Sequence, residues 1–255
     1  MGISAIVIAR DEEERIQTCL ESLSFADEIV VMVDSRTTDN TVQVARHFTK
    51  KVYTLDWPGY GKMREEAVAR AKHDWILWLD ADERVPPELA GEIQQVLAQK
   101  TLYAGYQMPR KAFFLGRWIR YGGWYPGYVT RLYYRDSASF SNSLVHEKIT
   151  VQGRIGTLSN ALHHHTDETI RHYYEKWNLY TSLAAEEIAG DGKTFHIPDL
   201  LFRPLFMFLK MYIIRLGFLD GMEGFMLAVF SANYVYTKYA KLWELNHSRC
   251  LKKDV

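Results

Sequence analysis

Asp80, Ala81 and Asp82 form a D-x-D segment that follows the apolar run 75–79. In an extended backbone the side chains of residues i and i+2 point to the same side, so both carboxylates can reach one cation. Carboxylate oxygens are suitable ligands for Mg²⁺ and Mn²⁺, and a cation held there can bridge the phosphates of a nucleotide diphosphate. The segment therefore indicates a metal and phosphate site. An acidic surface turn is the alternative interpretation, because such turns are common.

Two further acids, Asp11 and Asp34, come at or just after the ends of other apolar runs. In open α/β sheets the ligands bind beyond the carboxyl ends of the strands. We therefore expect these two acids to lie near Asp80 and to belong to the same nucleotide-sugar site.

His163, His164 and His165 are a second group of candidate ligands. Imidazole binds metals well, but three adjacent side chains cannot all face one ion. We expect the triplet to follow the sheet, where one histidine could complete the shell of the same cation or contact a diphosphate. Packing or exposure at a strand end is the alternative. No P-loop, G-x-G-x-x-G or Ser/His/Asp pattern offers competing chemistry.

The first hundred residues alternate between short apolar runs and segments with helical periodicity. This alternation predicts an α/β fold with a mostly parallel, Rossmann-like central sheet. The predicted strands cover residues 3–9, 28–33, 51–55 and 75–79. Predicted helices follow each strand, and the last of them begins at Pro86 and Pro87, because proline is tolerated in the first turn.

The middle of the chain has a different pattern and the opposite charge. Residues 1–99 contain 11 Lys and Arg against 18 Asp and Glu, whereas residues 100–154 contain nine against two. We predict strands over 104–109, 128–134 and 148–151, separated by a Gly- and Trp-rich stretch. Cations among aromatic side chains suit an anionic carbohydrate. A solvated basic face with ordinary aromatic packing is the alternative.

After Asp167 the pattern is helical to the end of the chain. Residues 200–219 are strongly apolar but contain three cations, and residues 225–237 are an uncharged run. Each run is too short or too charged for a spanning helix, which needs about 20 apolar residues. Helices lying in a membrane interface explain both the apolar residues and the cations. Packing against the rest of the chain or another subunit is the alternative.

Composition places the chain among ordinary globular proteins. Its 255 residues are 47% hydrophobic, which is enough for a full core. The two cysteines, Cys19 and Cys250, have no disulfide or zinc spacing. With no secretory pattern at Met1, we expect a cytoplasmic protein. We expect no nucleic-acid partner, and the oligomeric state stays open.

Taken together, these segments resemble glycosyltransferase family 2. The resemblance rests on IVIARDEEE (6–14), VDSRTTDNT (33–41), GYGKMREEAVARA (59–71) and LDADE (79–83), in this order and spacing. It continues through TRLYYR (130–135) and VHE (145–147) into the apolar C-terminal region. Within the family, the chain is similar to bacterial β-1,4-glucosyltransferases of the lipopolysaccharide core.

The resemblance implies a GT-A fold and an inverting, metal-dependent transfer of a hexose, glucose as the first choice. The donor would be a UDP-sugar and the acceptor a lipid-linked saccharide at the inner face of the cell membrane. A catalytic domain would cover residues 1–166, with a nucleotide-sugar half (1–99) and an acceptor half (100–166). Residues 167–255 would form a helical, membrane-associating extension.

The resemblance also implies roles for individual residues. Asp34 would contact the nucleobase or ribose, Arg64 the nucleotide, Asp80 the ribose and the Mg²⁺ or Mn²⁺ ion, and Asp82 the metal directly. Glu147 is the candidate catalytic base, because inversion requires one carboxylate to take the proton of the acceptor hydroxyl. A surface salt bridge is its alternative. Trp124 and Arg131 are candidates for acceptor binding, and Arg131 could instead orient Glu147.

Three positions depart from the family pattern, which usually has Asn at Asp11 and Glu65 and Gly near Arg36. An acid in place of an amide beside a nucleotide adds repulsion toward phosphate, so the donor is the least determined part of the prediction. The departures keep two alternatives open. One is transfer to polyprenyl phosphate, and the other is a non-catalytic nucleotide-sugar sensor or membrane scaffold.

Overall fold

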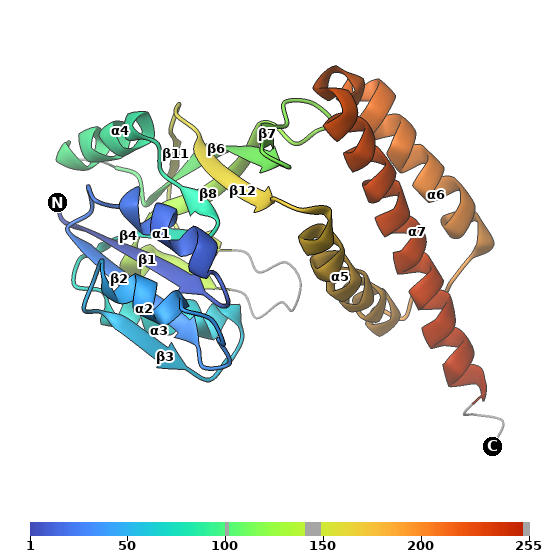
Figure 1. Cartoon of the computed structure of the whole chain (residues 1–255), viewed down its shortest axis with the longest axis horizontal. Coiled ribbons are helices and arrows are strands. Elements are labelled where there is room, and N and C mark those ends of the chain that lie inside the picture. The colour runs from blue at the N-terminus through green and yellow to red at the C-terminus, as the bar shows by residue number, and fades with distance from the viewer. Residues whose placement is uncertain (100–101, 141–148, 252–255) are drawn as a thin grey trace. The chain divides into compact units, whose positions relative to one another are not determined.

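The computed structural model describes residues 1–99, 102–140 and 149–251 and divides the chain into two compact units (Figure 1). The first unit contains residues 1–111 and 127–165 and is built on a large sheet. The second contains residues 112–126 and 166–255 and is mainly helical. Residues 112–126, which we assigned to the acceptor half, therefore group with the helices. The functional assignment of the two halves stays a prediction.

Four parallel strands form one side of the sheet, as the sequence predicted. They are β1 (Ile3–Ala9), β2 (Glu28–Asp34), β3 (Val52–Leu55) and β4 (Trp75–Asp80). Their spatial order is β3-β2-β1-β4, so β1 lies between β2 and β4. The register pairs Ile8 with both Met32 and Asp80, which brings the carboxyl ends of the three strands to one edge.

Helices cover both faces of the parallel strands because alternate residues of each strand point to opposite faces. One core contains Ala5 and Val7 of β1 and is covered by α1 (Glu13–Glu21), α2 (Thr41–Arg46) and α4 (Pro87–Ala98). The other contains Ile6 and Ile8 and is covered by α3 (Tyr60–Arg70). Both sets of core residues are buried, so the sheet is enclosed on both sides.

The remaining strands extend the sheet beyond β4. β8 (Gly127–Tyr134) pairs antiparallel with β4, and β6 (Gly105–Phe114) pairs antiparallel with β8. Next come β12 (Leu162–Asp167) and β5 (Glu83–Arg84), while β7 (Arg117–Trp118) and β11 (Ile155–Thr157) also pair with β6. β9 (Ala138–Phe140) and β10 (Ile149–Val151) form a separate pair. The histidine triplet, which we expected after the sheet, lies within it on β12.

The second unit is built from α5 (Ile170–Gly190), α6 (Ile197–Leu209) and α7 (Gly221–Leu251). A π-helical turn, η2 (Lys210–Ile214), and a 3₁₀ turn, η3 (Gly217–Asp220), connect α6 to α7, which lie side by side (Figure 1). Two small apolar clusters hold this unit together, one around Ala185 and Leu242 and one around Phe114 and Leu227. In the part of the chain that the structure describes, no helix combines the length and apolarity needed to cross a membrane.

Candidate active site

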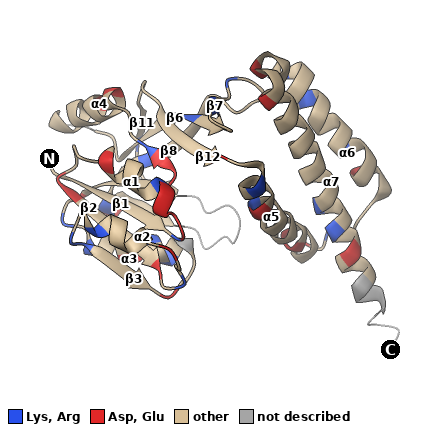
Figure 2. Cartoon of the chain, in the orientation of Figure 1, with Lys and Arg blue, Asp and Glu red and all other residues tan. Residues whose placement is uncertain are grey.

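Acidic side chains gather at the carboxyl edge of the parallel strands. Asp34 is the last residue of β2, Asp80 is the last residue of β4, and Asp11 follows β1 by two residues. The first turn of α1 adds Glu13 and Glu14 near this edge (Figure 2). Because β1 pairs with both β2 and β4, the predicted donor-side acids come from adjacent strands of one unit.

Asp34 is completely buried and makes a charged contact with Arg36. Its carboxylate accepts hydrogen bonds from the backbone N–H of Arg36 at 3.0 Å and from Nη2 of the same residue at 2.6 Å. The hydrogen bonds from Arg36 hold the pKa of Asp34 below its ordinary value, so this carboxylate is ionised at neutral pH. Arg36 therefore brings a positive charge to the place where we expect the nucleoside.

Asp11 organises the loop that follows β2. Its backbone is left-handed, with φ of 51°, a conformation that Asp and Asn tolerate better than most residues. Its Oδ1 accepts hydrogen bonds from the backbone N–H of Thr38 at 2.8 Å and from the Thr38 hydroxyl at 3.2 Å. Asp11 thus ties the ends of β1 and β2 together, a role that either Asp or Asn could fill.

The two acids of the D-x-D segment have different surroundings. Asp80 has a side chain that is 39% exposed, and its Oδ2 lies 2.7 Å from Nη2 of Arg131. Asp82 is largely buried, and its Oδ2 lies 3.2 Å from Nε2 of His164. The pairing of β12 with β5 causes this contact, because it sets His164 opposite Glu83. His163 and His165 flank it on the strand and point to the other face.

The arrangement fits a cation that the donor helps to bind. The described residues contain no group of three or more His, Cys, Asp or Glu side chains that could hold a metal alone. Asp82 and His164 supply a carboxylate and an imidazole, with Asp80 beside them, and diphosphate oxygens and water would fill the remaining positions. Mg²⁺ is commonly bound this way, through one or two carboxylates and substrate phosphates.

The next acid of the segment, Glu83, received no role from the sequence. Glu83 is completely buried, and its Oε1 accepts a hydrogen bond from Nη2 of Arg131 at 2.8 Å. Arg131 stacks on Trp78 with its Cζ 3.9 Å from the ring centre, and Arg64 stacks on the same ring at 3.6 Å. Burial disfavours the charged form of Arg131. The negative charges of Glu83 and Asp80 have the larger effect, so the pKa of Arg131 is raised.

The predicted site residues are divided between the two units, and one of them lies outside the described residues. Asp11, Asp34, Arg64, Asp80, Asp82 and Arg131 belong to the first unit. Arg131 lies buried against acids instead of exposed, and its contact with an acceptor stays a prediction. Trp124 belongs to the second unit, where it packs against a cluster that includes Phe114. The predicted base Glu147 lies outside the described residues.

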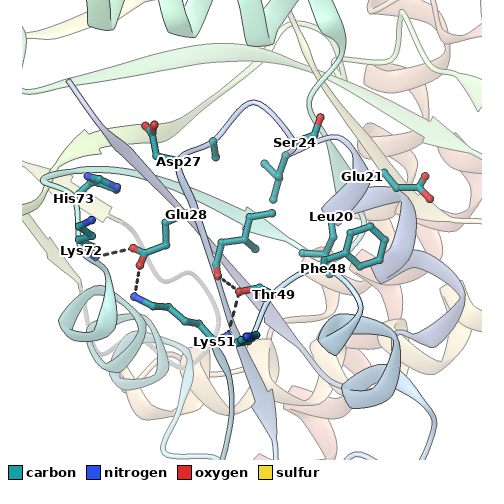
Figure 3. Close-up of a pocket in the computed structure, with 14 residues that line it drawn as sticks. Leu20, Glu21, Ser24, Asp27, Glu28, Phe48, Thr49, Lys51, Lys72 and His73 are labelled. Carbon is teal, nitrogen blue, oxygen red and sulfur yellow. Dashed lines mark hydrogen bonds and ion pairs between the residues drawn. The ribbon is translucent and has the colours of Figure 1, made fainter.

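An open pocket of about 770 Å³ lies at the other end of the parallel strands (Figure 3). It is lined by residues near the amino ends of β2 and β3, including Glu28, Lys51 and His73. Glu28 accepts a hydrogen bond from the backbone N–H of Lys72 and forms an ion pair with Lys51. None of the predicted site residues lines this pocket.

Comparisons with known proteins bear on the family and the fold of this chain. The model of the family described as Glycosyl transferase family 2 matches residues 4–148. An uncharacterized glycosyltransferase of Rickettsia bellii is 31% identical over 96% of this chain and 87% of its own length. The lipopolysaccharide core biosynthesis glycosyltransferase LpsC of Rhizobium meliloti is 28% identical over 96% of this chain and 93% of its own.

Among solved structures, the mannosyltransferase PcManGT of Pyrobaculum calidifontis, in complex with GDP-Man and Mn²⁺, has a similar fold. The TM-score is 0.55 at 12% sequence identity, and the match covers 94% of this chain and 86% of that one. The predicted class, a mostly parallel α/β sheet of the glycosyltransferase type with a C-terminal helical part, is confirmed. At this identity the likeness concerns the fold alone.

Proposed function

This chain belongs to glycosyl transferase family 2, and from that premise we propose that it transfers a hexose, glucose as the first choice, from a UDP-sugar to a lipid-linked saccharide with inversion. The observation that supports the donor side most strongly is the contact between Asp82, two residues after the half-exposed Asp80 that ends β4, and His164 of β12. The similarity to LpsC supports the lipopolysaccharide core as the acceptor class.

On the donor side, each residue would have a separate task. Asp82 and His164 would hold the cation, and Asp80 would face the cation and the ribose. Asp34, fixed as an anion by Arg36, would accept a hydrogen bond from the nucleoside. Arg64 on α3, already stacked on Trp78, would lie near the nucleotide. When bound, Mg²⁺ or Mn²⁺ would stabilise the negative charge of the departing diphosphate.

On the acceptor side, Glu147 would remove the proton from the attacking hydroxyl, as inversion in one displacement requires. Trp124 would offer an aromatic face to a sugar ring. For Glu147→Gln we expect turnover to disappear while UDP binding persists. Full activity in that variant would remove Glu147 from the mechanism.

We also place the protein at the cytoplasmic face of the membrane. The C-terminal hairpin surface, defined as the exposed apolar residues of α6, η2 and η3, supports this proposal. None of the residues of α6 is fully buried, although the helix is mostly apolar and nearly uncharged (Figure 2). Phe202 and Ile214 are each 66% exposed. Lys210 and Arg215 lie in and just after η2 and complement anionic lipid headgroups.

The decisive experiment measures UDP release from a panel of UDP-sugars, with GDP-mannose included, in the presence and absence of Mn²⁺. We expect Mn²⁺-dependent release that increases with truncated lipopolysaccharide. Asp82→Asn should lower the rate roughly a hundredfold or more. Asp27→Asn is the matched control, because Asp27 contacts the backbone of Ile3 at the opposite end of the sheet.

Each other outcome of this panel has a definite meaning. Stimulation by polyprenyl phosphate instead of lipopolysaccharide would show that polyprenyl phosphate is the acceptor of the same type of transfer reaction. Release of GDP alone would show that the donor is a GDP-sugar and not a UDP-sugar. Binding of UDP without release from any donor, in the presence of every acceptor, would contradict the transferase proposal.

A further inference from the structure

We propose that Glu83, the fourth residue of the Asp80-Ala81-Asp82-Glu83 segment, is a positioning residue that fixes the carboxylates of Asp80 and Asp82 for the cation. The inference rests on the proposed function, in which these acids serve the donor and its metal. Glu83 itself is completely buried and would touch neither donor nor cation. It would act through Arg131 and through the backbone of the segment.

Glu83 holds Asp80 in two ways. Its Oε2 accepts a hydrogen bond from the backbone N–H of Asp80 at 3.2 Å, which closes the turn at the end of β4. Its Oε1 accepts from Nη2 of Arg131 at 2.8 Å, and the same nitrogen donates to Oδ2 of Asp80 at 2.7 Å. Because Nη2 has two hydrogens, it can serve both carboxylates at once. The position of the Asp80 side chain therefore depends on that of Glu83.

Glu83 also lies in the strand pair that fixes Asp82. In β5 it stands opposite His164 of β12, whose Nε2 is 3.2 Å from Oδ2 of Asp82. The next residue, His165, donates its backbone N–H to the carbonyl of Asp82 at 2.9 Å. A displaced Glu83 would therefore disturb the Asp82 and His164 pair as well as Asp80.

Burial raises the pKa of Glu83, but the charge of Arg131 and its hydrogen bond favour the ionised carboxylate, so the two buried groups depend on each other. The Arg131 side chain is 6% exposed and stacks on Trp78, so it cannot exchange its acid partners for water. Removing one partner of a buried ion pair leaves an uncompensated charge, and the remaining groups must move to compensate it. Here the remaining partner is Asp80, which would be drawn toward Arg131 and away from a cation.

The test is calorimetric titration of the full chain with UDP at several Mn²⁺ concentrations. Glu83→Gln removes the charge with little change in shape, and Arg131→Lys keeps a charge but loses the planar guanidinium. Glu28→Gln is the matched control, because Glu28 is also a shielded acid paired with a lysine. It lies at the amino end of β2, about 20 Å from the carboxyl end.

We expect Glu83→Gln and Arg131→Lys each to weaken Mn²⁺-dependent UDP binding about tenfold or more, as changes in the outer shell of metal sites do. Glu28→Gln should leave this affinity unchanged even if it lowers the melting temperature. Because both residues act on Asp80 through one chain of contacts, the double variant should lose much less than the two single losses combined.

Native affinity in Glu83→Gln, whatever its melting temperature, would overturn the proposal. So would an Arg131→Lys variant that binds UDP and Mn²⁺ normally and raises only the KM for acceptor, since Arg131 would then serve the acceptor. If Glu83→Gln does not fold, Arg131→Lys decides the question. A wild-type chain that binds no UDP at any Mn²⁺ concentration would instead refute the proposed function, and this inference with it.

Discussion

At the scale of single residues, the contact between Asp34 and Arg36 determines the charge at the end of β2. The Asp34 carboxylate is buried, whereas the Arg36 side chain is 54% exposed, so the pair is open to solvent on one side only. Arg10 adds a second cation, with its Nε 3.8 Å from Asp34. A glycine at position 36 would provide no such charge. In the proposed donor site, Arg36 would therefore offset part of the repulsion that Asp11 would add toward phosphate.

This contact predicts a pH dependence of stability. The pKa of Asp34 is lower in the folded protein than its ordinary value of 3.8, chiefly because Arg36 hydrogen-bonds the ionised form. The contact therefore stabilises the fold above that ordinary value, and the stabilisation is lost as the pH falls through the folded pKa. Partial exposure of Arg36 limits the effect to about 1 kcal/mol.

Asp34→Asn should consequently lose less stability than the wild type between neutral pH and about pH 3. Urea unfolding at several pH values measures this difference. The pKa values of Glu28 and Asp39 are also lowered. Both acids are present in the wild type and in the variant, so they contribute equally to the two pH profiles. Identical pH profiles for the two proteins would show that the Asp34 contact contributes nothing.

Some of the site could be predicted from the sequence. The carboxyl ends of the parallel strands were predictable because apolar runs mark β1, β2 and β4, and the acids follow directly. The partners of these acids were not predictable from the sequence. His164 meets Asp82 across 82 residues of chain, and Arg131 meets Glu83 across 48, so both contacts depend on strand pairing that no local pattern shows.

At the scale of elements, the turns between α6 and α7 depend on glycines that let backbones approach closely. A Cβ on Gly224 would lie 2.0 Å from the carbonyl oxygen of Gly217, and one on Gly217 would lie 2.6 Å from that of Met211. Neither carbonyl belongs to a flexible side chain, so the start of α7 would have to move away from η3. The hairpin therefore has little tolerance for larger residues here.

Gly224→Ala should destabilise the second unit by about 1–3 kcal/mol, the usual cost of overpacking. Gly190→Ala is the matched control, because a Cβ at this position at the end of α5 would meet nothing within 4 Å. It should be neutral or stabilising by up to about 1 kcal/mol. Thermal unfolding together with limited proteolysis of residues 166–251 measures both effects. Equal stability of the two variants would contradict the close packing.

Elements with strong local patterns were predicted well, and those that depend on distant partners were not. β1 has the predicted bounds, and β2 and β4 each extend one residue further than predicted. β5 has only two residues and exists because β12 lies beside it. β12 itself contains three histidines, so it lacks the alternation of apolar and polar residues that marks a half-buried strand.

At the scale of the whole molecule, the C-terminal hairpin surface exposes several large apolar side chains, among them Phe202, Phe206 and Ile214. Large exposed apolar patches usually mark sites of contact with proteins or membranes. Two copies of the chain meeting through this surface would bring the positive charges of Lys210 and Arg215 from both copies into one interface. An anionic lipid surface would complement the same cations. Charge therefore favours a membrane over self-association.

Flotation of the full chain with liposomes tests this preference. We expect binding to vesicles that contain anionic lipid and weaker binding to zwitterionic vesicles. Each cation near an anionic surface contributes about 1 kcal/mol, so the double change Lys210→Gln with Arg215→Gln should weaken binding roughly thirtyfold.

Ile213→Ser with Ile214→Ser should weaken binding to both kinds of vesicle, because 51% and 66% of these residues' surfaces are exposed. Leu102→Ser, a change at an exposed leucine of the first unit, is the matched control and should bind normally. If the wild type instead forms a dimer that the isoleucine changes dissociate, and no vesicle binds it, the hairpin surface is a subunit interface.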